Sequence, residues 1–69
     1  MTNEKTTETR HHRFIRLSEA RVNALLEKIR LLGNLSSSFY EYSADEVNQI
    51  FRALQSALAD ARSRFKVLN

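Results

Sequence analysis

The chain has 69 residues, 28% of them charged, and a formal net charge of +3 at pH 7. A chain of this length forms one domain at most and has little volume for a hydrophobic core. Because it has no cysteine and only two histidines, disulfides are excluded and side-chain metal ligands are scarce. We therefore expect self-association, most simply as a homodimer, to supply the stability that two helices alone would lack.

The first nine residues are polar and rich in threonine, which predicts a disordered arm over residues 1–9. One of Thr6, Thr7 and Thr9 is expected to cap the first helix, with Glu8 in its first turn, where a negative charge suits the helix dipole. Such a start resembles neither a signal peptide nor a membrane span, so we expect a cytoplasmic protein without a membrane partner.

A first helix is predicted over about residues 10–32, where glycine and proline are absent. Its apolar residues recur at heptad spacing, with Ser18 at the missing step. They are Ile15, Val22, Leu25, Ile29 and Leu32. A second apolar arc lies across Arg21 and Lys28 on the same helix. Its members are Leu17, Ala20, Ala24 and Leu31, so this helix is expected to need two partners.

The predicted connection spans residues 33–43 and begins with Gly33, the only glycine of the chain. We expect Gly33 to adopt a left-handed conformation and to end the first helix. Three serines follow, and then the aromatic residues Phe39, Tyr40 and Tyr42. These aromatics are expected to cover the open end of the core, and the alternative is a recognition patch for a partner.

A second helix is predicted over about residues 44–66. Ser43 and Glu46 have the spacing of a capping box at its start. The apolar residues of this helix form a single ladder with steps of three and four. They are Val47, Phe51, Leu54, Leu58, Ala61, Phe65 and Leu68. The fold class is therefore all-α: residues 10–69 form an antiparallel helical hairpin, which is expected to dimerise into a four-helix bundle.

Basic residues are concentrated in the first helix. Residues 10–33 contain six Arg or Lys and two acids, whereas residues 34–69 contain four of each. Arg10, Arg13, Arg16 and Arg21 are candidate contacts to phosphates or to an acidic protein surface. The alternative is a solvated helix face that contacts no partner.

No catalytic or metal-binding pattern is recognisable. A nucleophile needs a neighbouring base and an orienting group, and no such set can be assembled from this sequence. His11 and His12 are adjacent and would point about 100° apart on a helix, which does not suit a shared metal ion. We therefore predict no enzyme activity, no cofactor, no metal and no small-molecule substrate.

The segments Ile29-Arg30-Leu31-Leu32-Gly33-Asn34-Leu35-Ser36 and Tyr40-Glu41-Tyr42-Ser43 resemble those of a family of short, uncharacterised bacterial helical-hairpin proteins. The resemblance covers most of residues 13–65 and implies a fold but transfers no functional residue. In architecture the chain also resembles the RNA-binding repressor of primer protein, a dimer of short helical hairpins, with which it shares the string Arg13-Phe14-Ile15-Arg16. Its longer aromatic connection departs from that protein, so this second likeness is an architectural analogy only.

Together these features predict a non-enzymatic interaction or regulatory protein, a homo-oligomeric helical bundle that binds another macromolecule. The alternative is a regulator that binds nucleic acid through the basic face of the first helix.

Overall fold

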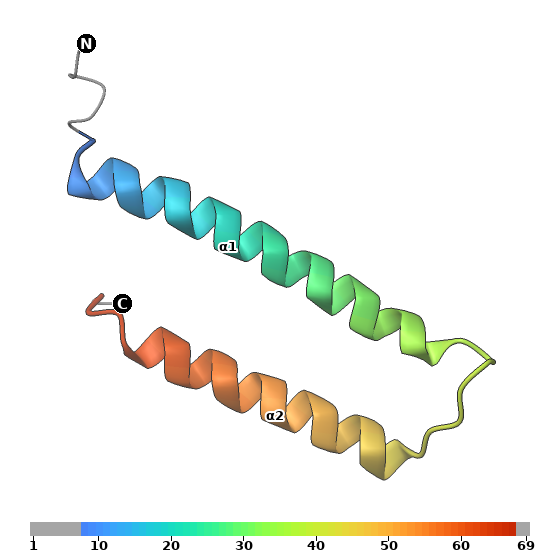
Figure 1. The fold of residues 1–69 in the computed structure, drawn as a ribbon. Coiled ribbons are helices and arrows are strands. Elements are labelled where there is room, and N and C mark those ends of the chain that lie inside the picture. Colours follow the sequence, from blue (N-terminus) through green and yellow to red (C-terminus); the bar gives the residue numbers. More distant parts are fainter. Residues whose placement is uncertain (1–7, 68–69) are drawn as a thin grey trace. The chain divides into compact units, whose positions relative to one another are not determined.

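The computed structural model describes residues 8–67, which form two α-helices joined through a short 3-10 helix (Figure 1). Helix α1 spans Arg10–Gly33, η2 spans Asn34–Ser36, and α2 spans Ala44–Ser63. No strand occurs among the described residues, so the predicted all-α class is confirmed. The chain divides after Phe39 into two units, one containing α1 and η2 and the other containing α2, and each is described by itself.

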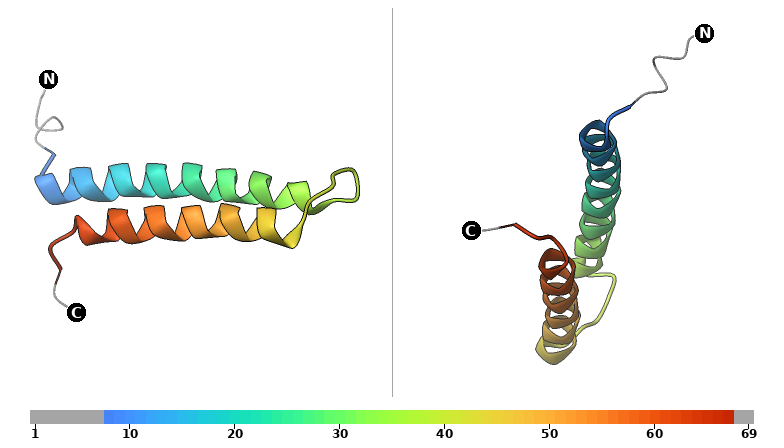
Figure 2. Two further views of the ribbon diagram at one scale, coloured as in Figure 1. Left: turned by 90° about the horizontal axis from the view of Figure 1, so that it is seen from below. Right: turned by 90° about the vertical axis from the view of Figure 1, so that its left-hand side faces the viewer.

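Helix α1 is a continuous helix of 24 residues (Figure 2). Thr9 is its N-cap: the Thr9 side chain accepts a hydrogen bond from the backbone N–H of His12 at 3.0 Å. Thr9 was one of the three predicted caps. The expectation that Glu8 lies in the first turn is wrong, because the helix begins only at Arg10 and its first turn holds no acid. Residues 1–7 of the predicted arm lie outside the part of the chain that the structure describes.

Gly33 is not the left-handed cap that the sequence suggested. Its φ and ψ are −62° and −25°, which are helical values, and no described residue has a positive φ. The backbone N–H of Asn34 reaches the carbonyls at the end of α1, and η2 then continues the helical path. These tightened hydrogen bonds satisfy carbonyls that a left-handed glycine would otherwise cap. The chain leaves helical geometry only at Ser37, which has a ψ of 162°.

Helix α2 begins with the predicted capping box. The backbone N–H of Glu46 donates to the Ser43 hydroxyl at 3.1 Å, and the backbone N–H of Ser43 donates to the Glu46 carboxylate at 2.9 Å. The helix ends at Ser63, earlier than predicted, because the N–H groups of Arg64 and Phe65 turn to the carbonyls three residues back. Phe65 therefore lies beyond the helix, and Leu68 lies outside the described residues.

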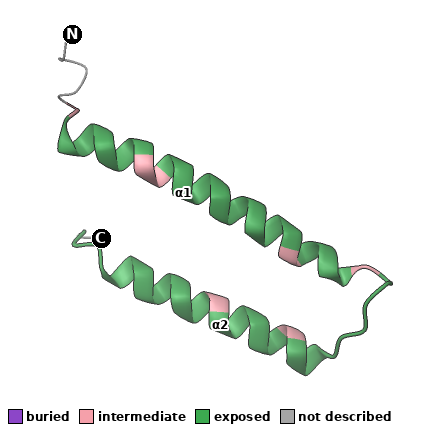
Figure 3. Ribbon diagram, viewed as in Figure 1, coloured by how far each residue is buried: buried purple, intermediate pink, exposed green. Residues whose placement is uncertain are grey.

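No described residue is buried (Figure 3). Both helices carry large apolar side chains that are exposed. Leu17, Leu32, Val47 and Leu54 are half-buried, and most of the other apolar positions are exposed. A typical protein of this size hides such residues in a core. Each helix thus offers apolar surface that its own backbone does not cover.

Candidate interaction surfaces

The first turn of α1 is rich in basic side chains. Arg10, His11, His12 and Arg13 are all exposed there. Positive charge at a helix N-terminus opposes the helix dipole. The Thr9 cap satisfies one backbone N–H of this turn, but it brings no negative charge. Glu8, whose pKa is lowered mainly by its hydrogen bonds with Arg16 and further by the charges of Arg13 and His12, supplies a negative charge just before this turn.

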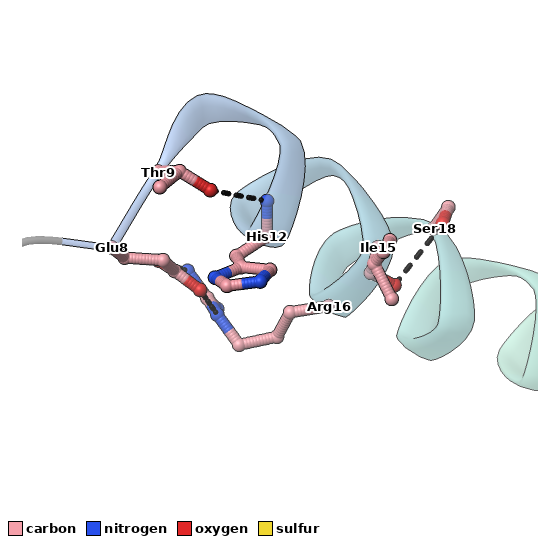
Figure 4. A network of polar contacts seen from close by, with 6 residues as sticks. All are labelled: Glu8, Thr9, His12, Ile15, Arg16 and Ser18. Atoms are coloured by element: carbon pink, nitrogen blue, oxygen red, sulfur yellow. Dashed lines mark hydrogen bonds and ion pairs between the residues drawn. The ribbon is translucent and has the colours of Figure 1, made fainter.

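An ion pair that the sequence did not suggest joins Glu8 to Arg16. The Arg16 guanidinium donates to both carboxylate oxygens of Glu8, from Nε at 2.9 Å and from Nη2 at 3.0 Å (Figure 4). This hydrogen bonding lowers the pKa of Glu8 and raises the pKa of Arg16. Arg16 thus differs from Arg10, Arg13 and Arg21 in having an acidic side chain bound to its guanidinium at two points.

A second ion pair on α1 joins Arg30 to Glu27. The Arg30 guanidinium donates to Glu27 at 3.1 Å from Nε and at 2.6 Å from Nη2. The pair lowers the pKa of Glu27 and raises the pKa of Arg30, with side-chain hydrogen bonding as the main cause. Glu27 and Arg30 are three residues apart, a spacing that places side chains side by side on a helix.

Four cations of α1 have no acidic partner within residues 8–67: Arg10, Arg13, Arg21 and Lys28. All four are exposed. Successive residues of an α-helix are turned by about 100°, so Arg10, Arg21 and Lys28 fall within about 20° of one another, and Arg13 lies about 60° from Arg10. Three of the four predicted contact residues thus share one face with Lys28, and the fourth, Arg16, is held by Glu8.

The aromatic residues of the connection do not close a core within either unit. Phe39 is 93% exposed, and Tyr40 and Tyr42 are 56% and 54% exposed. The Ser37 hydroxyl accepts a hydrogen bond from the backbone N–H of Phe39 at 3.3 Å, which orders the turn before this ring. The expectation that these rings cover the open end of a core concerns the assembled bundle and stays a prediction, as does the alternative of a recognition patch.

A shallow, open depression at the start of α2 is lined by Glu41, Tyr42, Ser43 and Glu46. Two of these residues are already used: Ser43 and Glu46 bond each other's backbone in the capping box. The depression therefore follows from the way in which α2 begins, and its polar groups stabilise the helix end.

The single apolar face of α2 is the most regular surface of the chain. Val47, Ile50, Leu54, Leu58 and Ala61 fall in one arc at about 100° per residue. Asn48, Gln49, Arg52 and Gln55 occupy other directions. Only Val47 and Leu54 of the arc are half-buried, and the rest are exposed. Such a stripe is typical of a helix that packs against a partner.

Within residues 8–67, no three histidine or acidic side chains are grouped as metal ligands would be. Likewise, neither described helix is long and apolar enough to cross a membrane. Comparison with protein-family models, with curated proteins and with solved structures finds no match. The resemblance to a bacterial helical-hairpin family therefore stays a prediction.

Proposed function

We propose that this chain is a non-enzymatic interaction protein that self-associates through its apolar helix stripes. In this proposal, two antiparallel hairpins form a four-helix bundle, and the remaining surface binds another macromolecule. The observation that carries the proposal is that none of residues 8–67 is buried, although both helices carry an apolar stripe. A homodimer is the simplest closed assembly that covers such stripes.

The apolar stripe of α2 supports self-association most directly. Its large residues repeat over the full length of the helix, and its polar residues are confined to the other faces. Burying a leucine or isoleucine side chain contributes about 1.5–3 kcal/mol. If the stripe stayed in water, the protein would lose this stabilising free energy at every turn of the helix.

Helix α1 supports the same conclusion through Ser18, which interrupts its apolar stripe. The Ser18 hydroxyl donates to the carbonyl of Ile15 at 3.1 Å, within the same helix. A hydroxyl satisfied in this way can enter an apolar interface without an unpaired donor. The stripe can therefore be covered by a partner along its whole length, despite the polar residue in it.

The surface outside the stripes is the proposed site for a further macromolecule. It includes the basic turn at the start of α1 and the exposed rings of Phe39 and Tyr40. Aromatic and arginine side chains are enriched at the centres of protein interfaces. A role as a stoichiometric binding protein in the cytoplasm is consistent with these surfaces and stays a prediction.

Light scattering tests the self-association. The chain has a mass of 8.0 kDa, and we expect twice that value in solution. Leu54→Asp places a charge within the α2 stripe, and we expect it to abolish the dimer and most of the helical signal in circular dichroism. Gln55→Asp is the matched control, since it adds the same charge one residue later at an exposed position outside the stripe. A wild-type monomer, or a dimer of Leu54→Asp, would contradict the proposal.

A further inference from the structure

We propose that α1 binds double-helical DNA through its phosphates, using a cationic face formed by Arg10, Arg13, Arg21 and Lys28. The phosphates of such a duplex form a regular and dense array of negative charge. This inference deepens the proposed function, because it assumes that self-association covers the apolar stripe of α1 and leaves the cationic face outside. It also assigns a role to the second apolar arc of α1, which lies between these cations.

The cationic face consists of the Arg and Lys residues of α1 that form no ion pair with an acid of residues 8–67. Arg16 and Arg30, which lie about 120° and 160° from Arg10 around the helix axis, are paired with Glu8 and Glu27. Glu19 lies about 180° from Arg10 around the helix axis. Arg10, Arg21 and Lys28 therefore share the side of the helix opposite Glu19, whereas Arg13 lies towards Glu8 and its charge contributes to lowering the pKa of Glu8, after the larger effect of Arg16. A face that gathers charges of one sign attracts polyanions more strongly than an evenly mixed surface does.

The cationic face is long, and its length suits the extended row of phosphates on a duplex better than a small acidic patch on a protein. From Arg10 to Lys28 the helix rises about 27 Å at 1.5 Å per residue. Duplex DNA offers one negative charge for about every 1.7 Å of its axis, so phosphates are available along that whole distance. A phosphate near the first turn would also offset the repulsion between Arg10, Arg13 and the positive end of the helix dipole.

The side chains between the cations favour contact with the phosphate backbone alone. They are Leu17, Ala20, Ala24 and Leu31, which have no hydrogen-bonding group and no ring for stacking on bases. Single-stranded nucleic acid is bound chiefly by aromatic stacking, and duplex RNA is recognised in part through its 2′-hydroxyls. The small side chains of Ala20 and Ala24 let the helix approach the backbone closely. The face therefore suits duplex DNA, without sequence preference.

The cationic face and the apolar stripe of α1 can be occupied together. Val22, Leu25 and Ile29 of the stripe centre about 100° from Arg10 around the helix axis. Leu25 and Leu32 lie about 40° and 20° from Arg21, so Arg21 and Lys28 border the stripe, and a second copy seated there would leave their charged ends in water. A dimer would present the face twice, which raises the affinity for a duplex long enough to reach both copies.

Fluorescence anisotropy with a labelled DNA duplex of about 20 base pairs tests the inference. Four phosphate contacts predict a slope of about −3.6 in log K against log salt, so binding should weaken about 150-fold between roughly 50 mM and 200 mM salt. A slope near zero would overturn the inference. Tighter binding to a duplex RNA or a single strand of the same sequence would also overturn it.

Two double variants of equal charge locate the binding face. We expect Arg21→Gln with Lys28→Gln to weaken binding at about 50 mM salt by at least about 20-fold and to halve the slope. Arg16→Gln with Arg30→Gln removes the same charge from the paired residues, and we expect a loss of less than about threefold. Equal losses in the two variants would show a response to net charge alone and would overturn the assigned face. Circular dichroism of both variants verifies that α1 is intact.

Light scattering without DNA separates this inference from the proposed function. A dimer that does not bind the duplex overturns the cationic face alone. A monomer that binds the duplex with the expected variant pattern overturns self-association alone.

Discussion

The two helices of this chain begin in opposite electrostatic ways. Helix α2 has Asp45 and Glu46 in its first turn, where they stabilise the positive end of the dipole, and a capping box that satisfies two backbone groups. Helix α1 has a single threonine cap, and its first turn holds cations and no acid. A sequence shaped only for helix stability would start both helices alike. The start of α1 is therefore less favourable in its electrostatics than the start of α2.

The two helices also differ in how apolar and charged residues are distributed around them. Helix α2 separates one apolar arc from a polar remainder, whereas α1 intersperses a second apolar arc with unpaired cations. One arc is sufficient for a core shared between helices. The second arc of α1 offers a further apolar contact, which fits the expectation that this helix packs against two partners.

The largest expected effect distinguishes the two arcs of α1 directly. Leu25 lies in the stripe and Leu31 in the second arc, and they are almost equally exposed at 47% and 46%. We expect Leu25→Asp to destabilise the dimer by more than about 3 kcal/mol, because it places a charge in the interface. Leu31→Asp should cost less than about 1 kcal/mol but should weaken DNA binding. Urea denaturation and anisotropy measure the two effects, and equal destabilisation would remove the distinction between the arcs.

The caps predict a smaller difference between the helices. Ser43→Ala removes the acceptor for the Glu46 N–H and breaks the reciprocal box, so we expect a loss of about 1–2 kcal/mol in the free energy of unfolding. Thr9→Ala removes one hydrogen bond and should cost about 1 kcal/mol or less. Thermal denaturation of both variants gives the comparison. A larger cost at Thr9 would mean that α1 depends more on its cap than α2 does.

Gly33 offers a test at the opposite end of α1. It has helical φ and ψ, and an added Cβ would meet no atom within 4 Å. We expect Gly33→Ala to stabilise the protein by about 0.5–1 kcal/mol, because alanine loses less conformational entropy in a helix than glycine does. Destabilisation by the same substitution in chemical denaturation would instead indicate the left-handed cap suggested by the sequence.

The smallest effect concerns the pKa of Glu8. Its hydrogen bonds with Arg16 hold this pKa below the ordinary value of 4.5. The ion pair therefore stabilises the start of α1 above pH 4.5 and loses this effect as the pH falls through the lowered pKa. We expect Arg16→Gln to return the pKa of Glu8 towards its ordinary value in an NMR titration. Arg30→Gln is the control, since it should shift the pKa of Glu27 and leave that of Glu8 unchanged.

The helices and their starts could be predicted from sequence because their causes are local. An apolar residue at every third or fourth position predicts an amphipathic helix wherever it occurs. The Ser43 to Glu46 spacing predicts hydrogen bonds that span only one turn. The ends of the helices were harder to predict, since the last carbonyls have several alternative donors. At Gly33 and at Ser63 the tighter three-residue hydrogen bonds formed in place of the expected endings.

The basic character of α1 follows from its local sequence, whereas its ion pairs depend on the conformation of the chain. The sequence by itself determined that this helix is basic and amphipathic, since both properties follow from composition and period. Only the three-dimensional structure decided which cations remain available. The bend of the chain at Thr9 brings Glu8 back to Arg16, eight residues along the sequence, and thereby separates Arg16 from Arg10, Arg13 and Arg21. Such a pairing depends on backbone angles at one residue, which neither period nor composition specifies.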